Sequence, residues 1–207
     1  MDFSLIETLR WQPDAGFLRL DQHLRRLARS ADALGFRQPQ DAKGKLEKEV
    51  SGSEPLRVRL VMTYRGKMEV SATPFEPQPD ETVWRLKVAK TRLQSEDSLF
   101  RHKTTRREPY DAARAEFSKD EADEVILLNE RGEVCEGTIT NLFAEAADGM
   151  LLTPPLTSGL LPGVLRAELI RERRARGEVL KLDDLRHRKL FVGNSLRGLI
   201  RAEMVES

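Results

Sequence analysis

The change of hydrophobic period along the first 75 residues is the feature that most limits the fold. Residues 3–11 (FSLIETLRW) carry apolar residues in rough alternation, which predicts a β-strand. In residues 20–36 apolar positions recur at helical spacing, with Asp21 as the expected N-cap and Gly35 as the expected stop. Residues 56–75 return to two strand-like segments around a glycine-containing turn, which predicts a β-hairpin.

The remaining residues mix strands and helices without a regular βαβ series. The expected elements are a strand over 83–89, a helix over 108–117, strands over 124–128, 134–144 and 151–153, a helix over 164–176 ended by Gly177, a strand over 179–182, a short helix over 183–189, and a strand–loop–strand unit over 190–205. This order predicts an α+β protein of two lobes rather than one doubly wound sheet. We expect an N-terminal lobe over residues 1–92, a linker over 93–100 and a C-terminal lobe over 101–207.

Composition excludes several classes of protein. The 207 residues are 39% hydrophobic and 33% charged, which excludes collagen, disulfide scaffolds and wholesale disorder. Lys and Arg number 35 against 34 Asp and Glu, and this balance argues against a protein that coats nucleic acid or an anionic membrane. The single cysteine, an acid at the second position and the lack of a long apolar run lead us to expect a cytoplasmic protein.

The basic run over residues 101–107 (RHKTTRR) has the most unusual local chemistry. It fits a solvated loop or a non-catalytic module that binds nucleic acid or a partner. It also fits a reactive lysine, because neighbouring positive charge disfavours the ammonium form of Lys103, whose ordinary pKa is ~10.4. The three histidines are far apart in sequence, so we expect no metal site.

Three further segments contain polar groups in otherwise apolar surroundings. Glu136 interrupts the apolar pattern of CEGTITNLF, and Gly163 in PGVLR opens a predicted helix, where backbone N–H groups attract anions. Residues 193–198 (GNSLRG) form a polar loop between two apolar segments. Taken singly, these features also suit a surface acid, a helix cap and a hairpin loop.

Taken in order, the segments resemble the class IV, fold-type IV family of pyridoxal-phosphate enzymes. This family includes branched-chain and D-amino-acid aminotransferases and 4-amino-4-deoxychorismate lyase. The motifs FSLIETLRW, HKTTRR-x-x-YD, NERGEVxEGTxxNLF and GLLPGVxR are most similar to the lyase-like domain fused to aminodeoxychorismate synthase. The resemblance extends from residue 3 to about residue 205. It implies a D-amino-acid aminotransferase-like fold, pyridoxal 5'-phosphate as cofactor and a homodimer.

The resemblance also implies roles for individual residues. Lys103 matches the lysine that forms the Schiff base, and Glu136 matches the acid that pairs with the pyridine nitrogen. Arg26 in HLRRL matches a phosphate ligand, whereas Arg25 is expected to face solvent. The other expected phosphate-side residues are Gly163, Val164, Leu165 and Asn194, with leucine at 165 replacing the usual threonine. The expected substrate-side residues are Arg106, Arg107, Tyr110, Ser195 and Arg197, with Ser195 near the substrate carboxylate.

Two enzymatic activities remain open from the sequence. A lyase would convert 4-amino-4-deoxychorismate to 4-aminobenzoate and pyruvate in the folate branch and would pair functionally with aminodeoxychorismate synthase. An aminotransferase would act on branched-chain or D-amino acids. Both take a small amino substrate. The arginines expected near the site favour a dicarboxylate and hence the lyase.

Overall fold

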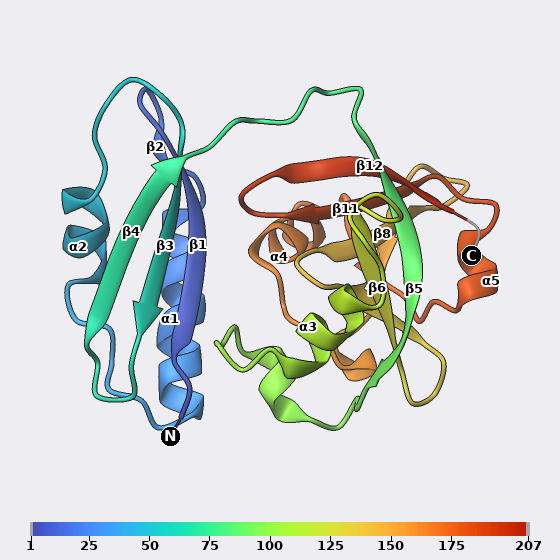
Figure 1. The fold of residues 1–207 in the computed structure, drawn as a ribbon, viewed down its shortest axis with the longest axis horizontal. Helices are drawn as coiled ribbons and strands as arrows, with labels where there is room; N and C mark the ends of the chain where they lie inside the picture. The colour runs from blue at the N-terminus through green and yellow to red at the C-terminus, as the bar shows by residue number, and fades with distance from the viewer. Residues whose placement is uncertain (1, 206–207) are drawn as a thin grey trace. The chain divides into compact units, whose positions relative to one another are not determined.

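The computed structural model describes residues 2–205, and it confirms the predicted α+β class with two separate sheets (Figure 1). No helix in this range has the length and apolar character needed to cross a bilayer. The helices and strands are β1 Leu5–Gln12, β2 Gly16–Phe17, α1 Leu20–Ala33, α2 Ala42–Lys48, β3 Leu56–Met62, β4 Met68–Pro74, β5 Val83–Leu93, α3 Glu108–Ala115, β6 Glu124–Asn129, β7 Val134–Gly137, β8 Asn141–Glu145, β9 Leu151–Thr153, α4 Val164–Arg171, β10 Ala175–Gly177, α5 Leu182–Leu185, β11 Leu190–Asn194 and β12 Gly198–Met204.

The chain forms two compact units whose boundaries differ from the predicted division. The first unit contains the residues up to Pro77 together with His102–Arg106 and Ser195–Arg197. The second contains Gln78–Arg101, Arg107–Asn194 and the residues from Gly198 onward. The predicted N-terminal lobe included β5, but β5 pairs with β6 and β12 and therefore belongs to the second unit.

The first unit is a four-stranded sheet in the order β2-β1-β3-β4 with α1 against one face (Figure 1). Alternate residues of β3, such as Val58 and Leu60, pack with α1 side chains. The β3–β4 hairpin confirms the prediction for residues 56–75. The predicted N-cap Asp21 is wrong, because Arg19 in the left-handed region immediately precedes α1. Gly35 follows the helix with a φ of 70°, as its role as a stop requires.

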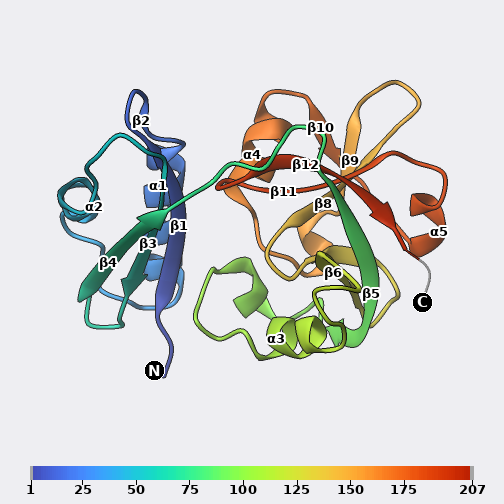
Figure 2. The same cartoon turned by 45° about the horizontal axis from the view of Figure 1, so that its top comes forward.

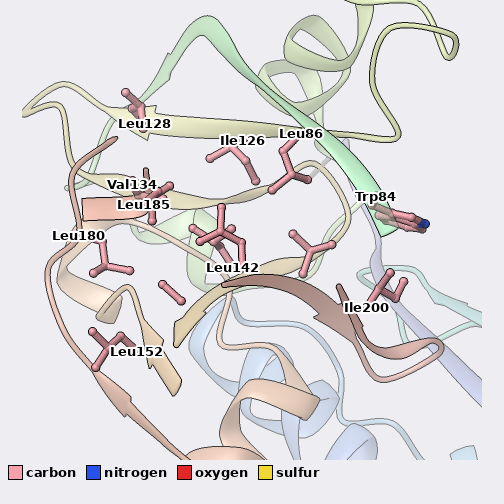
Figure 3. Packing of buried hydrophobic residues seen from close by; sticks show 13 residues of the cluster. Trp84, Leu86, Ile126, Leu128, Val134, Leu142, Leu152, Leu180, Leu185 and Ile200 are labelled. Carbon is pink, nitrogen blue, oxygen red and sulfur yellow. The ribbon is translucent and has the colours of Figure 1, made fainter. Parts of the chain in front are cut away.

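The second unit is an eight-stranded sheet in the order β10-β9-β8-β11-β12-β5-β6-β7, in which β5 runs beside β6 (Figure 2). One apolar cluster contains residues from every strand of this sheet except β10, so the sheet curls around a common core. In Figure 3 the side chains of Leu86, Ile126 and Leu142 point into this core. The opposite face of β5, β6 and β7 packs against α3, and α4 packs over β8 and β11.

Tertiary contacts divide one predicted strand and shorten one predicted helix. The strand predicted over 134–144 is two strands, since residues 138–140 turn and direct β8 to pair with β9 and β11. The helix predicted over 164–176 ends at Arg171, because residues 175–177 pair in parallel with β9 as β10. Gly177 is therefore a strand residue, and residues 179–182 do not form the predicted strand.

Candidate active site

The backbone of Lys103 is attached to β1 within the first unit. The Ile6 N–H donates to the Lys103 carbonyl over 2.9 Å, and the Thr105 N–H donates to the Ser4 carbonyl over 2.9 Å. These two hydrogen bonds flank an isolated antiparallel bridge, so residues 103–105 extend the sheet beside the N-terminal half of β1. β2 pairs only with the other end of β1, which leaves this edge open for the lysine segment.

A buried carboxylate, Glu7 of β1, lies at the centre of a hydrogen-bond network in the same unit. Arg26 donates to both of its oxygens, with Nε–Oε1 at 2.8 Å and Nη2–Oε2 at 2.6 Å. His23 Nδ1 lies 2.7 Å from Glu7 Oε2, and His23 Nε2 lies 2.7 Å from Ser195 Oγ. Glu7 is 2% exposed and His23 is 1% exposed, so the network is shielded from water.

The network sets the ionisation of both acid and imidazole. Burial raises the pKa of Glu7, but the charge and hydrogen bonds of Arg26, with the His23 bond, outweigh burial and lower it to about 2. Burial lowers the pKa of His23 below its ordinary value, against the opposing effect of Glu7. The positive charges of Arg26 and Lys103 lower it further. Glu7 is therefore ionised and His23 neutral at neutral pH.

Glu136 accepts hydrogen bonds from side-chain and backbone donors of the second unit. The Tyr110 hydroxyl donates to its Oε1 over 2.7 Å, and the Leu161 N–H donates to the same oxygen over 3.0 Å. Asn141 Nδ2 lies 3.3 Å from Oε2. Tyr110 was expected on the substrate side, and in the structure its hydroxyl contacts the carboxylate instead. Burial and the negative charge of Glu136 raise the pKa of Tyr110 well above 10, so this hydroxyl stays a donor.

Arg107, another residue expected on the substrate side, supports this arrangement. Its guanidinium carbon lies 4.9 Å from the centre of the Tyr110 ring, and its Nη2 donates to the Thr138 carbonyl over 2.7 Å. One edge of the guanidinium is therefore committed to the turn that follows Glu136. Arg107 connects α3 to the β7–β8 turn.

The N-terminus of α4 lies close to Asn141 in the same unit. Gly163 is the N-cap, and a Cβ atom added there would lie 1.9 Å from Asn141 Oδ1, so a larger residue would displace the Asn141 side chain from its contact with Glu136. Leu165 is buried in a cluster with Phe143, which gives the leucine an apolar packing role. Asn194, at the end of β11, donates from Nδ2 to the Ile139 carbonyl over 3.1 Å.

The residues predicted for the site are divided between the two units. Arg26, Lys103, Arg106, Ser195 and Arg197 lie in the first unit, and Arg107, Tyr110, Glu136, Gly163, Val164, Leu165 and Asn194 lie in the second. The sequence analysis did not identify Glu7, His23 or Asn141 as part of the site. For Glu7, the sequence did contain a signal, which is an acid at a core-facing position of the first strand. Within residues 2–205, no group of three or more His, Cys, Asp or Glu side chains is placed to hold a metal ion.

The donor set fits pyridoxal phosphate. A primary amine suits the cofactor aldehyde, and a buried carboxylate with fixed donors suits a protonated pyridine nitrogen. A guanidinium and a helix N-terminus capped by glycine suit a phosphate dianion. Fold and functional groups together define a pyridoxal-phosphate-dependent enzyme.

The chain belongs to the class IV aminotransferase family, whose family model, "Amino-transferase class IV", matches residues 4–204. This confirms the fold-type IV resemblance and pyridoxal 5'-phosphate as the cofactor. Because the family consists of enzymes, the basic run 101–107 is part of an enzyme rather than of a non-catalytic binding module.

Individual relatives carry two kinds of name. A Schizosaccharomyces pombe protein named "Putative aminodeoxychorismate lyase" is 29% identical over 213 residues, which cover 98% of this chain and 90% of that protein. The crystal structure of a "Putative amino-acid aminotransferase" from Mesorhizobium loti is 53% identical with a TM-score of 0.95, covering 99% of this chain and 100% of that one. A "Putative 4-amino-4-deoxychorismate lyase" structure is 27% identical with a TM-score of 0.81, covering 97% and 84%.

Proposed function

We propose that this enzyme is an aminodeoxychorismate lyase, which converts 4-amino-4-deoxychorismate to 4-aminobenzoate and pyruvate. The observation that supports it most is the similarity, over nearly the whole length of both chains, to the Schizosaccharomyces pombe protein named for this activity. Its substrate carries two carboxylates, whereas branched-chain amino acids carry one carboxylate and an apolar side chain. A dicarboxylate calls for more than one cationic group on the protein.

An arginine-rich sheet face in the first unit supports a dicarboxylate substrate. Arg10 of β1 lies directly opposite Arg57 of β3, and Arg59 lies two residues further along β3 on the same face. This face is opposite to the one that packs against α1, since the alternate residues Val58 and Leu60 belong to the core. Like charges directly opposite each other are unfavourable unless an anion compensates them. Arg10 Nε is also buried without a hydrogen-bond partner among the described residues.

The roles proposed for individual residues follow from their chemistry. The bound cofactor supplies an electron sink for the electrons of the substrate Cα–H bond. Lys103 Nζ is the primary amine that would hold the cofactor and, once free, would accept the substrate α-proton as a general base. Glu136 would hold the proton of the pyridine nitrogen, while Tyr110, Leu161 and Asn141 keep its carboxylate oriented. Arg26, Asn194 and the N-terminus of α4 are the groups whose chemistry would suit the phosphate.

The second candidate is an amino-acid aminotransferase. The similarity to the Mesorhizobium loti protein, which carries that name, favours it. The two reactions share the loss of the α-proton, so substitution of Glu136 would impair both and would not distinguish them. They differ in what becomes of the amino group. The lyase would keep the amino group in its product, 4-aminobenzoate, and leave the Lys103-bound cofactor unchanged overall, whereas an aminotransferase would move the amino group from its substrate to the cofactor.

The deciding experiment gives the purified enzyme enzymatically made aminodeoxychorismate and measures 4-aminobenzoate and pyruvate. We expect equal amounts of the two products, with no lasting loss of the yellow absorbance of the lysine-bound cofactor. L-leucine, L-glutamate and D-alanine should bleach this absorbance slowly at most. Rapid bleaching by one of them, with no 4-aminobenzoate formed, would establish the aminotransferase instead.

The proposal includes a homodimer that acts in the cytoplasm within folate biosynthesis. It also includes functional pairing with aminodeoxychorismate synthase, because that enzyme makes the substrate of the lyase. Light scattering measures the mass of the particle, and a coupled assay with the synthase tests the pairing. A monomer with full activity would contradict the dimer.

A further inference from the structure

Glu7 is a buried acid that is linked to two residues expected to face ligands, directly to Arg26 and through His23 to Ser195. It accepts two hydrogen bonds from Arg26, the proposed phosphate ligand, and one from His23, which contacts Ser195. An ionised acid is rarely buried unless it is paired, and breaking such a pair is strongly destabilising. The arrangement therefore fixes the geometry of its partners more strictly than an exposed ion pair would.

The direction of each hydrogen bond in this network follows from the ionisation of its members. The ionised carboxylate of Glu7 only accepts, so the proton between it and His23 belongs to Nδ1. A neutral imidazole has one N–H group, and His23 Nε2 is then an acceptor. The Ser195 hydroxyl, 2.7 Å away, donates its hydrogen to this nitrogen.

A second hydrogen bond holds Ser195 from its backbone. Arg19 Nη1 donates to the Ser195 carbonyl over 3.3 Å. The side chain and the carbonyl of Ser195 are thus both bound to residues at the N-terminal end of α1 or just before it. Ser195 is buried. Because its hydroxyl hydrogen points to His23, the hydroxyl presents only lone pairs to other groups, and these lone pairs would repel an anionic oxygen.

We propose that Glu7 and His23 are positioning residues, which align Arg26 toward the cofactor phosphate and lock the Ser195 hydroxyl hydrogen toward His23. This inference rests on the proposed function for the ligand of Arg26. It changes the role expected for Ser195, which anchors its loop rather than donating to a substrate carboxylate. Arg197 of the same loop is then the cationic group that suits the carboxylate.

The charged groups around His23 keep the hydrogen bond between Ser195 and His23 in one direction, with Ser195 as the donor. Glu7 of β1 faces Nδ1, Arg26 lies on the same helix, and Lys103 comes from the 102–106 segment. The two cations disfavour an imidazolium at this position. Nε2 would become a donor, and release the Ser195 hydrogen, only if His23 were protonated or if its neutral ring carried the proton on Nε2.

Nitrogen-15 NMR of the full-length, cofactor-loaded enzyme tests the direction of the bonds. The chain has only 3 histidines, and a His23→Gln variant assigns the signal. Between about pH 7 and 8.5 we expect the neutral tautomer with its proton on Nδ1. Ser195→Ala should shift the Nε2 resonance, and Ser195→Thr, which keeps the hydroxyl, should restore it. An Nε2–H tautomer or an imidazolium in the wild-type protein would overturn the inference.

Cofactor affinity tests the alignment of Arg26. Glu7→Gln replaces one acceptor oxygen by a donor, and we expect about tenfold weaker binding of pyridoxal phosphate, as for loss of a partner that orients a ligating side chain. Glu133→Gln is the matched control, because Glu133 also has a pKa lowered to about 2, chiefly by its hydrogen bond from Arg131. This control should leave the affinity within about twofold.

The outcomes separate the inference from the proposed function. Wild-type protein that does not bind pyridoxal phosphate would refute the proposed function, while the tautomer of His23 would still decide the bond directions. Wild-type binding with equal affinity in Glu7→Gln would refute the positioning role alone. If Glu7→Gln does not fold, judged by circular dichroism, the His23 spectra of the wild-type and Ser195 variants decide the inference.

Discussion

Substitution of Arg26 tests the energetics of the buried Glu7 network. The pKa of Glu7 lies at about 2 in the folded protein against an ordinary value of 4.5. A pKa difference of about 2.5 corresponds to about 3 kcal/mol of folding free energy, at about 1.36 kcal/mol for each pKa unit. Because the folded pKa is the lower one, this stabilisation is present above about pH 4.5 and is lost as the pH falls through about 2.

Arg26→Ala removes the main cation that opposes the burial of Glu7. We expect the free energy of unfolding at pH 7.5 to fall by about 3–5 kcal/mol, the cost of leaving a buried charge unpaired. Burial then raises the pKa of Glu7 above its ordinary value, so the folded variant binds a proton in mild acid. The difference from the wild type should consequently shrink as the pH falls toward about 4.5.

Urea unfolding at the two pH values measures this difference. Trp11 of β1 lies in the first unit and Trp84 of β5 in the second, so a Trp84→Phe background makes fluorescence report the first unit. The control is Arg25→Ala on the exposed side of the same helix, expected to change stability by no more than about 0.5 kcal/mol. Equal losses for Arg25 and Arg26, or a loss for Arg26 independent of pH, would refute the reasoning.

Three further predictions concern single side chains. Borohydride reduction of the loaded enzyme followed by peptide mapping should place the pyridoxyl group on Lys103, and labelling of another lysine would contradict the assignment. In a Tyr64→Phe variant, where Tyr110 is the one remaining tyrosine, phenolate absorbance should appear only well above pH 10, because burial and Glu136 raise the pKa of Tyr110. Cys135 is buried, and burial raises the pKa of its thiol, so it should react with Ellman's reagent only after unfolding. Rapid reaction of the native enzyme would show that this strand opens.

Local sequence patterns predicted the elements that pack against neighbouring segments of the chain. The 20–36 helix and the 56–75 hairpin form where the hydrophobic period and glycine turns predict them, because each buries one face against a neighbour in sequence. The identity of the chemical groups was also readable, since Lys103 and Glu136 lie in short motifs of distinctive composition.

Elements that depend on distant partners could not be read from the sequence. The break between β7 and β8 arises because the buried carboxylate of Glu124, on a different strand, accepts bonds from Thr138, Ile139 and Thr140. The end of α4 depends likewise on β9, which captures residues 175–177 as a parallel strand. In both segments the residues at the break are largely polar, but nothing in their local sequence identifies the distant strand that causes the break.

The orientation of the functional side chains was decided by tertiary structure alone. Glu7 lies 19 positions from Arg26, and His23 lies 172 positions from Ser195, so no spacing rule connects them. Their hydrogen bonds form because the fold brings a strand, a helix and a returning loop into one buried network. Low dielectric surroundings then make each proton position definite, which sets what Arg26 and Ser195 present to a ligand.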